Sequence, residues 1–122
     1  KADFPVSAQC FRVNVVDGHM VSLRVNLNKK ATLEEVVAAM RDFPSLDLHS
    51  APQPFIGFTD EPSRPQTRLD RDNGNGMTIT VGRVFPDNVF DYRMVALSHN
   101  TVRGAAGCAV LNAELLASKG ML

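Results

Sequence analysis

The stretch "MTITVGRVFPDNVFDYRMVALS", residues 77–98, contains two apolar runs separated by a turn sequence. The runs "MTITVGRVF" and "VFDYRMVALS" are rich in β-branched and aromatic residues, which favour strands. Between them lie Pro86, Asp87 and Asn88, residue types that are typical of turns. The stretch therefore predicts a pair of strands that are neighbours in the fold.

A helix is predicted directly after this strand pair. It covers about residues 102–118, and either Asn100 or Thr101 can cap its start. Gly120 is placed to end it, because glycine readily adopts the left-handed conformation found after helices.

A second helix is predicted before the strand pair, in "TLEEVVAAMRDF", residues 32–43. Thr32 and Glu35 have the spacing of a capping box, in which each side chain bonds to the backbone amide of the other residue. Phe43-Pro44 would stop the helix, because the residue before a proline disfavours helical backbone. Its apolar residues fall on one face: Leu33, Val36, Val37 and Met40.

The segment 9–27 predicts a β-hairpin. The runs "CFRVNVV" and "MVSLRVNL" flank Asp17-Gly18, and an Asp-Gly pair between apolar runs is a strong hairpin signal. Residues 45–76 are rich in Pro, Asp, Arg and Gly and predict mostly loop, with one short apolar break at "FIGF". Together these elements predict an α+β fold, an antiparallel or mixed β-sheet covered by helices.

Composition narrows the possible functions. The 122 residues suit a single domain, and 44% of them are hydrophobic, which is enough to form a core. Lys plus Arg number 13 and Asp plus Glu number 13, so we expect no nucleic-acid partner and no anionic membrane partner. No apolar run approaches the roughly 20 residues that span a bilayer, and the first residues carry no signal-peptide core. We expect a cytoplasmic protein.

The two cysteines, Cys10 and Cys108, do not form a disulfide framework, and no Cys/His spacing predicts a metal site. We expect free thiols that behave as small buried apolar residues. An alternative is a self-contained enzyme that uses Cys10 and His19 as nucleophile and base.

Arg12 and His19 are the two residues whose chemistry looks least like packing. If Asp17 and Gly18 form a two-residue turn, both side chains lie on one face of the hairpin, roughly 13 Å apart at about 3.3 Å per residue. The arginine fork suits a carboxylate, and histidine can exchange a proton at neutral pH. This pair predicts a site for a small carboxylate, although a solvated arginine and an exposed histidine would fit the spacing too.

Three separated blocks then resemble a known enzyme family: "RVNVVDGH", "RPQTRLDRDNGNGMTITVGRV" and "LSHNTVRGAAGCAVLNAELL". In this order they resemble the C-terminal part of aspartate-β-semialdehyde dehydrogenase, in the branch that includes the fungal enzymes. The resemblance runs through nearly the whole chain. It implies part of a glyceraldehyde-3-phosphate-dehydrogenase-like catalytic and dimerisation domain over residues 1–99, and over residues 100–122 a helix that returns to the nucleotide-binding domain.

The resemblance also implies roles for individual residues. In this family an arginine and a histidine with the same spacing bind the substrate carboxylate and act as acid/base catalyst, which assigns these roles to Arg12 and His19. Asn14 stands where the family usually has proline. The implied reaction interconverts aspartyl phosphate and aspartate semialdehyde plus phosphate, through a cysteine thioester and NADP. It belongs to the biosynthesis of lysine, threonine, methionine and isoleucine.

The segment before the last helix is implied to approach the cofactor. On this basis Asn100 is a predicted nicotinamide contact, and Thr101 and Gly104 are further predicted cofactor contacts. An alternative for the small residues Gly104, Ala105 and Gly107 is tight packing between helix and sheet. The family also implies a homo-oligomer, a dimer or a tetramer.

Two parts of the family's machinery do not occur in this sequence. There is no Ser-Asn-Cys-like stretch for the nucleophile, and "NGNG" at 73–76 lacks the spacing of a dinucleotide-binding loop. We therefore expect a C-terminal portion of the enzyme that has no dehydrogenase activity alone. The alternative is an assembly module that self-associates without catalysis.

Three features stay without a functional assignment. His49 and His99 are predicted to be structural. The charged run "RPQTRLDRD" places Arg64, Arg68 and Arg71 near Asp70 and Asp72, and predicts either an ion-pair network or a phosphate or subunit contact.

Overall fold

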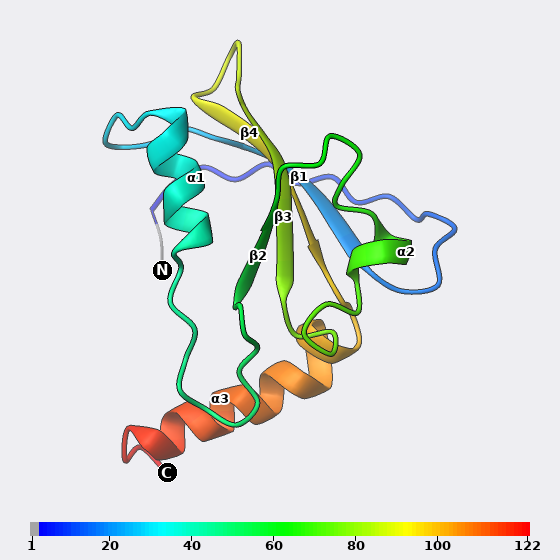
Figure 1. The fold of residues 1–122 in the computed structure, drawn as a ribbon, viewed down its shortest axis with the longest axis vertical. Helices are drawn as coiled ribbons and strands as arrows, with labels where there is room; N and C mark the ends of the chain where they lie inside the picture. Colours follow the sequence, from blue (N-terminus) through cyan, green and yellow to red (C-terminus); the bar gives the residue numbers. More distant parts are fainter. Residues whose placement is uncertain (1–2) are drawn as a thin grey trace.

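The structure is a computed structural model that describes residues 3–122. A four-stranded sheet with the order β1-β4-β3-β2 forms its centre (Figure 1). β4 pairs antiparallel with both β1 and β3, whereas β2 pairs parallel with β3. The predicted α+β class with a mixed sheet is therefore confirmed. The strands are β1 (His19–Val25), β2 (Ile56–Thr59), β3 (Ile79–Pro86) and β4 (Tyr92–Ser98).

The strand pair predicted in residues 77–98 is confirmed as β3 and β4, the two central strands of the sheet. Their antiparallel register is interrupted between Gly82 and Phe85 by an irregularity of the β-bulge type. Inside it, Arg83 has a φ of 55°, which is left-handed backbone that non-glycine residues seldom adopt.

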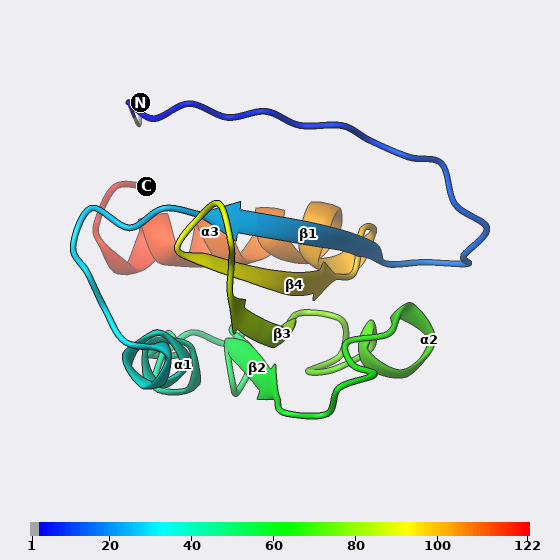
Figure 2. The same ribbon diagram turned by 90° about the horizontal axis from the view of Figure 1, so that it is seen from above.

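The hairpin predicted over residues 9–27 is wrong. Only its second half is a strand, β1, and β1 pairs with β4 from His19 opposite Ser98 to Val25 opposite Tyr92. Residues 9–16 belong to no strand and run apart from β1, as the start of the blue trace in Figure 2 shows. Gly18 does have the positive φ, 106°, that such a turn can use, but its amide bonds to Asn100 rather than closing a hairpin.

The helix predicted over residues 32–43 is confirmed as α1 (Leu33–Arg41). Its capping box is present, since the Glu35 amide donates to Thr32 Oγ1 over 3.2 Å and the Thr32 amide donates to Glu35 Oε2 over 2.7 Å. The apolar face of α1 packs on a core of buried sheet residues: Val81, Val84, Tyr92 and Met94.

The helix predicted over residues 102–118 is confirmed, but its first turn is wider than an α-helix. A π-helical turn, η1 (Val102–Ala106), leads into α3 (Gly107–Ser118). Gly120, at φ 65°, ends the helix as predicted. Its amide bonds to Ala117 O and the Met121 amide to Leu116 O, which are the two bonds of a Schellman motif.

The segment 45–76 contains more structure than predicted. "FIGF" contributes β2, and Thr67–Asp70 form the short helix α2. A run of four apolar residues is too short to predict a strand from its sequence pattern. What makes it a strand is its parallel pairing with β3, which is distant in the sequence. Contacts with α3 also hold this segment. The amide and Oγ of Ser50 donate to Glu114 over 2.9 and 2.8 Å and keep the pKa of that carboxyl below its usual range.

The two faces of the sheet differ. The face that carries Tyr92 and Met94 is the one on which α1 packs. The opposite face carries Met20 and Arg93, which are exposed; we call it the open face. Within residues 3–122, no helix is both long enough and apolar enough to cross a bilayer.

Candidate functional site

The beginning of β1 and the end of β4 meet at one end of the sheet. His19 lies opposite Ser98 in the ladder, and the Gly18 amide donates a hydrogen bond of 2.7 Å to Oδ1 of Asn100. The residue before the predicted acid/base catalyst therefore contacts a predicted cofactor residue through its backbone amide. We call the residues 18–19 and 98–101 the strand-end site.

Gly18 is buried at this site, and its conformation excludes other residues. Its φ is 106°, and a Cβ there would lie 3.2 Å from Thr67 Cγ2 and 3.3 Å from Leu97 Cδ1. The short helix α2 thus packs against the bend that leads into β1. This close packing fixes the backbone from which His19 projects.

His19 itself is exposed. Its cross-strand neighbour Ser98 is half-buried, so the side chain of His19 lies at the boundary between the packed part of the sheet and solvent. An exposed imidazole on a fixed backbone can reach a ligand and exchange a proton with it.

The N-cap of the last helix is Thr101, one of the two predicted positions, but the side chain that accepts from the first amides is that of His99. The ring is buried, and its Nδ1 is 3.3 Å from the amide nitrogens of both Thr101 and Val102, from which it accepts. Thr101 occupies the cap position but makes no side-chain capping bond. Asn100 Oδ1 is taken by Gly18. Helix capping by histidine has no distinctive sequence signal, but this structural role agrees with the prediction for His99.

The small residues of the helix start fall into two groups. A Cβ on Gly107 would clash with Met77 Sδ, so this glycine allows the last helix to pack closely against the turn that precedes β3. A Cβ on Gly104 would meet only His99 O, at 3.5 Å, which is an ordinary contact. Gly104 is exposed, and its surface is open to a ligand.

Arg12 lies on the exposed N-terminal segment and not on a strand. The shared hairpin face that would place it beside His19 therefore does not form. Among residues 3–122, no hydrogen bond or ion pair involves its guanidinium. Arg12 and His19 are therefore connected only by the chain between them, which bends at Gly18.

The charged run at 64–72 is in part an ion-pair network. The Arg64 guanidinium holds both carboxylate oxygens of Asp70, with Nε at 3.0 and 2.9 Å, and the Gln66 amide adds a bond of 2.7 Å. Asp70 is only 2% exposed. Burial alone would raise its pKa, but the bonds from Arg64 and Gln66 hold it below the usual value. The pair anchors α2, which in turn packs against Gly18.

The cysteines take no part in this site. Both are free, but the prediction that both are buried is wrong, because Cys10 is exposed and Cys108 is half-buried. Among the described residues, no group of three or more His, Cys, Asp or Glu side chains could hold a metal ion.

Comparison with known proteins identifies relatives along the whole chain. The family "Semialdehyde dehydrogenase, dimerisation domain" matches residues 1–103. An aspartate-semialdehyde dehydrogenase of Archaeoglobus fulgidus is 50% identical over 115 residues, which cover 94% of this chain and 34% of the relative. One of Aspergillus fumigatus is 51% identical over 126 residues, covering 96% and 35%. The chain thus spans about a third of the length of these relatives.

Solved structures give the same result. The aspartate-semialdehyde dehydrogenase of Candida albicans with NADP superposes with a TM-score of 0.76 at 41% identity, over 91% of this chain and 33% of that one. Aspartate-semialdehyde dehydrogenase II of Vibrio cholerae gives 0.68 at 27% identity, over 88% and 29%.

Proposed function

Because this chain belongs to the semialdehyde dehydrogenase dimerisation-domain family, we propose that it forms the catalytic and dimerisation region of an aspartate-semialdehyde dehydrogenase. Such an enzyme is an oxidoreductase of amino-acid biosynthesis. The observation that carries the proposal is the hydrogen bond between Gly18 and Asn100, because it joins the bend before His19 to the start of the last helix. Acid/base catalyst and cofactor contact must be neighbours in a hydride-transfer site.

His19 acts as the proton acceptor in the direction that oxidises aspartate semialdehyde. As the sulfur of a cysteine from another part of the enzyme adds to the aldehyde carbon, His19 would pass the thiol proton to the carbonyl oxygen. His19 would then take this proton back from the resulting hydroxyl group, and NADP, when bound, would supply the hydride acceptor. In the reverse direction His19 returns this proton to the oxygen. The exposed imidazole on a fixed backbone suits both steps.

Arg12 holds the α-carboxylate of the substrate through its planar fork. It lies on the segment that enters the strand-end site through the bend at Gly18, and its guanidinium is exposed. Binding the carboxylate there aims the aldehyde of the same molecule at the sulfur.

The residues at the helix start fit a nicotinamide. Asn100 Oδ1 is held by the Gly18 amide, which orients the carboxamide and leaves its NH₂ group to donate to a carboxamide oxygen. The open surface of Gly104 and the exposed side chain of Thr101 allow a flat ring to approach. We therefore assign Asn100, Thr101 and Gly104 to the NADP contact, with NADP as the hydride acceptor.

Other parts of the complete enzyme supply the nucleophilic cysteine and the dinucleotide-binding loop. We expect no turnover of aspartate semialdehyde with NADP and phosphate by the 122-residue chain alone. Residues 100–122 would then pack on the nucleotide-binding domain.

A second function, self-association, is supported by the family description and by the open face of the sheet. Met20 and Phe85 on this face are 49% and 44% exposed, and β1 is an edge strand. Sedimentation velocity of the chain tests it. We expect a dimer or tetramer that dissociates on dilution, and a monomer at every concentration would contradict the assembly role.

A chimeric enzyme tests the catalytic role. The 122 residues replace the aligned segment of the Candida albicans relative, which is 43% identical over 128 residues. Reduction of NADP by aspartate semialdehyde is then measured. We expect activity from the chimera and, for His19→Asn, a loss of kcat of about 10²- to 10⁴-fold.

Two further variants separate the roles. Arg12→Lys should raise KM for aspartate semialdehyde about tenfold or more, because a lysine cannot form the bidentate pair. His49→Asn is the matched control, since His49 is an exposed loop histidine, and it should keep the activity of the chimera. If His19→Asn behaves like His49→Asn, His19 is not the acid/base catalyst.

A further inference from the structure

His99 satisfies three backbone amides at the start of the last helix. Its ring Nδ1 lies 3.3 Å from the amide nitrogens of Thr101 and Val102, and its carbonyl oxygen accepts the amide of Gly104 over 2.9 Å. The side chain and the main chain of one residue thus hold the turn from 99 to 104. Asn100 lies within this turn. The conformation of the turn therefore determines where the Asn100 side chain points.

These contacts fit one neutral tautomer of the His99 ring. Nδ1 accepts and so carries no hydrogen, and in a neutral imidazole the hydrogen is then on Nε2. Oδ1 of Asp72 lies 3.7 Å from Nε2, and a nearby carboxylate favours a hydrogen on the nitrogen that faces it. Asp72 thereby favours the tautomer that leaves Nδ1 free to accept the helix amides.

The turn formed by "NGNG", residues 73–76, packs against the ring. Gly76 is buried and has a φ of 78°. A Cβ there would lie only 3.2 Å from His99 Cδ2 and 3.1 Å from Val102 Cβ. A residue with a side chain would therefore displace the ring, which gives this glycine-rich run a role in placing His99.

The segment that contains α2 and this turn supports the strand-end site at two points. At its beginning Thr67 packs against Gly18, and at its end Gly76 packs against His99. Gly18 and Asn100 are joined by their hydrogen bond. Both partners of that bond are thus held by the same segment, Gly18 directly and Asn100 through His99.

We propose that His99 is a positioning residue of the strand-end site. It sets the direction of the Asn100 side chain, and through the bond from Gly18 it also fixes the bend before His19. Its ring is 8% exposed, and the contacts described for both ring nitrogens are with this chain, so it acts through Asn100 and not on a ligand. The inference rests on the proposed function, from which Asn100 and His19 take their roles.

Two substitutions that both remove the ring separate the acceptor from the packing. In His99→Asn the carboxamide can present an oxygen where Nδ1 lies. In His99→Gln the carboxamide reaches instead to the place of Nε2, which leaves the amides of Thr101 and Val102 without their acceptor.

The kinetics of the chimeric enzyme distinguish positioning from stability. His99→Gln should raise KM for NADP about tenfold and leave KM for aspartate semialdehyde unchanged, whereas His99→Asn should stay within about twofold of the wild type. A purely structural role would lower the amount of folded enzyme, which reduces the apparent kcat and leaves both KM values unchanged. Equal KM values for NADP in the two variants would overturn the proposal.

Asn100→Asp identifies the route of the effect. This variant lacks the NH₂ donor proposed for the nicotinamide, so adding His99→Gln should raise KM for NADP no further. If the two substitutions instead act independently and their effects multiply, His99 does not act through Asn100.

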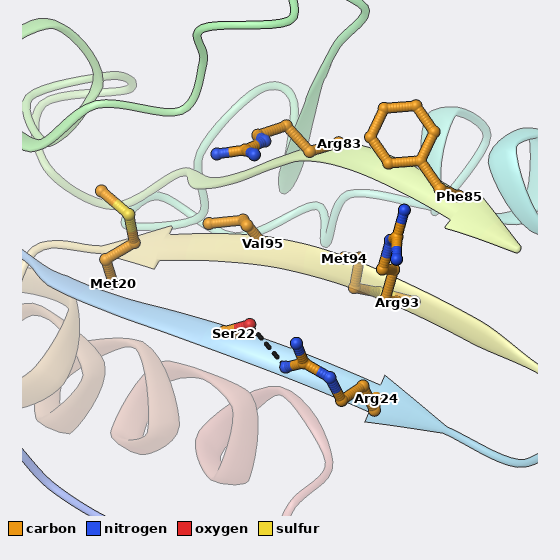
Figure 3. Close-up of a pocket in the computed structure, with 8 residues that line it drawn as sticks. All are labelled: Met20, Ser22, Arg24, Arg83, Phe85, Arg93, Met94 and Val95. Atoms are coloured by element: carbon orange, nitrogen blue, oxygen red, sulfur yellow. Dashed lines mark hydrogen bonds between the residues drawn. The ribbon is translucent and has the colours of Figure 1, made fainter. Parts of the chain in front are cut away.

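The open face of the sheet lies outside this arrangement. Figure 3 shows Met20, Ser22 and Arg24 of β1 at a hollow on that face. These residues alternate along the strand with His19, so the His19 side chain lies on the opposite side. His99→Gln should therefore sediment as the wild type does. Altered sedimentation would show that the substitution disturbs the whole sheet, and it would overturn a local role.

Hydrogen exchange of the 122-residue chain tests the proposal without any activity. The Gly18 amide reports its bond to Asn100. Relative to the amides of the β3–β4 ladder, its exchange should become about tenfold faster in His99→Gln and stay unchanged in His99→Asn. An unchanged Gly18 amide in folded His99→Gln would overturn the proposal. An inactive wild-type chimera would contradict the proposed catalytic function and leave this readout intact, so the two failures are distinguishable.

Discussion

Oδ1 of Asn100 accepts the amide hydrogen of Gly18 over 2.7 Å, a bond between residues that are 82 positions apart in the chain. It connects the bend before β1 to the segment between β4 and η1. Since His19 follows Gly18 directly, the position of the proposed catalyst depends on a side chain that belongs to the proposed cofactor contact.

Two substitutions of Asn100 separate these two duties. Asn100→Ala removes the acceptor and leaves the amide of the buried Gly18 without a partner, which should lower the free energy of unfolding of the chain by about 1 to 3 kcal/mol. Asn100→Asp keeps an acceptor at the same place and should be much less destabilising. Urea unfolding of the chain measures both effects.

The same two variants have a different signature in the chimeric enzyme. Asn100→Asp loses the NH₂ donor proposed for the nicotinamide, so KM for NADP should rise although the chain is stable. Asn100→Ala should raise KM and also lower kcat, because the bend before His19 loosens. Unchanged NADP kinetics in Asn100→Asp would remove Asn100 from the cofactor contact.

Gly18→Ala tests the bend itself. An alanine at this position would have to keep the backbone φ of 106°, which is strained for a residue with a side chain. Its Cβ would also lie only 3.2 Å from Thr67 Cγ2 and 3.3 Å from Leu97 Cδ1, so we expect a loss of about 1 to 3 kcal/mol of stability. Thermal unfolding measures it. Thr67→Ser removes the closest methyl group, and the double variant should recover part of the loss but not the strain at φ.

Gly104→Ala is the control for this experiment. Gly104 has no positive φ, and a Cβ there has space, so alanine should leave stability unchanged or raise it by up to about 1 kcal/mol. A loss as large as that of Gly18→Ala would contradict the open surface assigned to Gly104.

The sequence predicted elements whose signals are local. The capping box of Thr32 and Glu35, the helix end at Gly120 and the turn between β3 and β4 all depend on residues close together in the chain. The Asp17-Gly18 hairpin failed for the opposite reason. The partner of β1 is β4, far along the chain, and this pairing left residues 9–16 outside the sheet. Register between distant strands has no short-range signature.

The candidate site follows the same division. Arg12 and His19 were selected for their chemistry and spacing, but their expected proximity depended on the hairpin and failed with it. Asn100 was assigned to the cofactor through the family resemblance, and its bond to Gly18 could not be read from the sequence. Neither could the role of His99, because a capping histidine is recognised only by the position of its ring nitrogen.

Alanine substitutions of Thr32 and Thr101 test which side chains cap the two helices. Thr32→Ala removes the side chain that accepts from the Glu35 amide, so it should cost about 1 kcal/mol of stability. Thr101→Ala should cost close to nothing, because His99 and not Thr101 accepts the first amides of its helix. Chemical denaturation of the two variants side by side provides the comparison. Equal losses would restore Thr101 as a cap.

Asp70 determines part of the acid sensitivity of the fold. Its pKa in the folded chain is held below the ordinary value of 3.8. The unfolded chain therefore takes up the proton first as the pH falls. The carboxylate contributes its full stability above about pH 3.8, and this contribution is lost as the pH decreases towards the folded pKa. Asp70→Asn should remove this part of the acid-induced loss.

The same substitution has a cost at neutral pH. Asp70 is buried and paired with Arg64, so Asp70→Asn should lower stability at pH 7 by about 3 kcal/mol. Asp47→Asn is the matched control, because Asp47 is exposed and has no hydrogen bond or ion pair among the described residues. Urea unfolding across the acid range should show two nearly parallel curves for the wild type and Asp47→Asn, and a flatter one for Asp70→Asn. If the stability of all three proteins decreases in parallel as the pH falls, the Arg64–Asp70 pair does not contribute to acid unfolding. In that case α2 is held against Gly18 by apolar contacts alone.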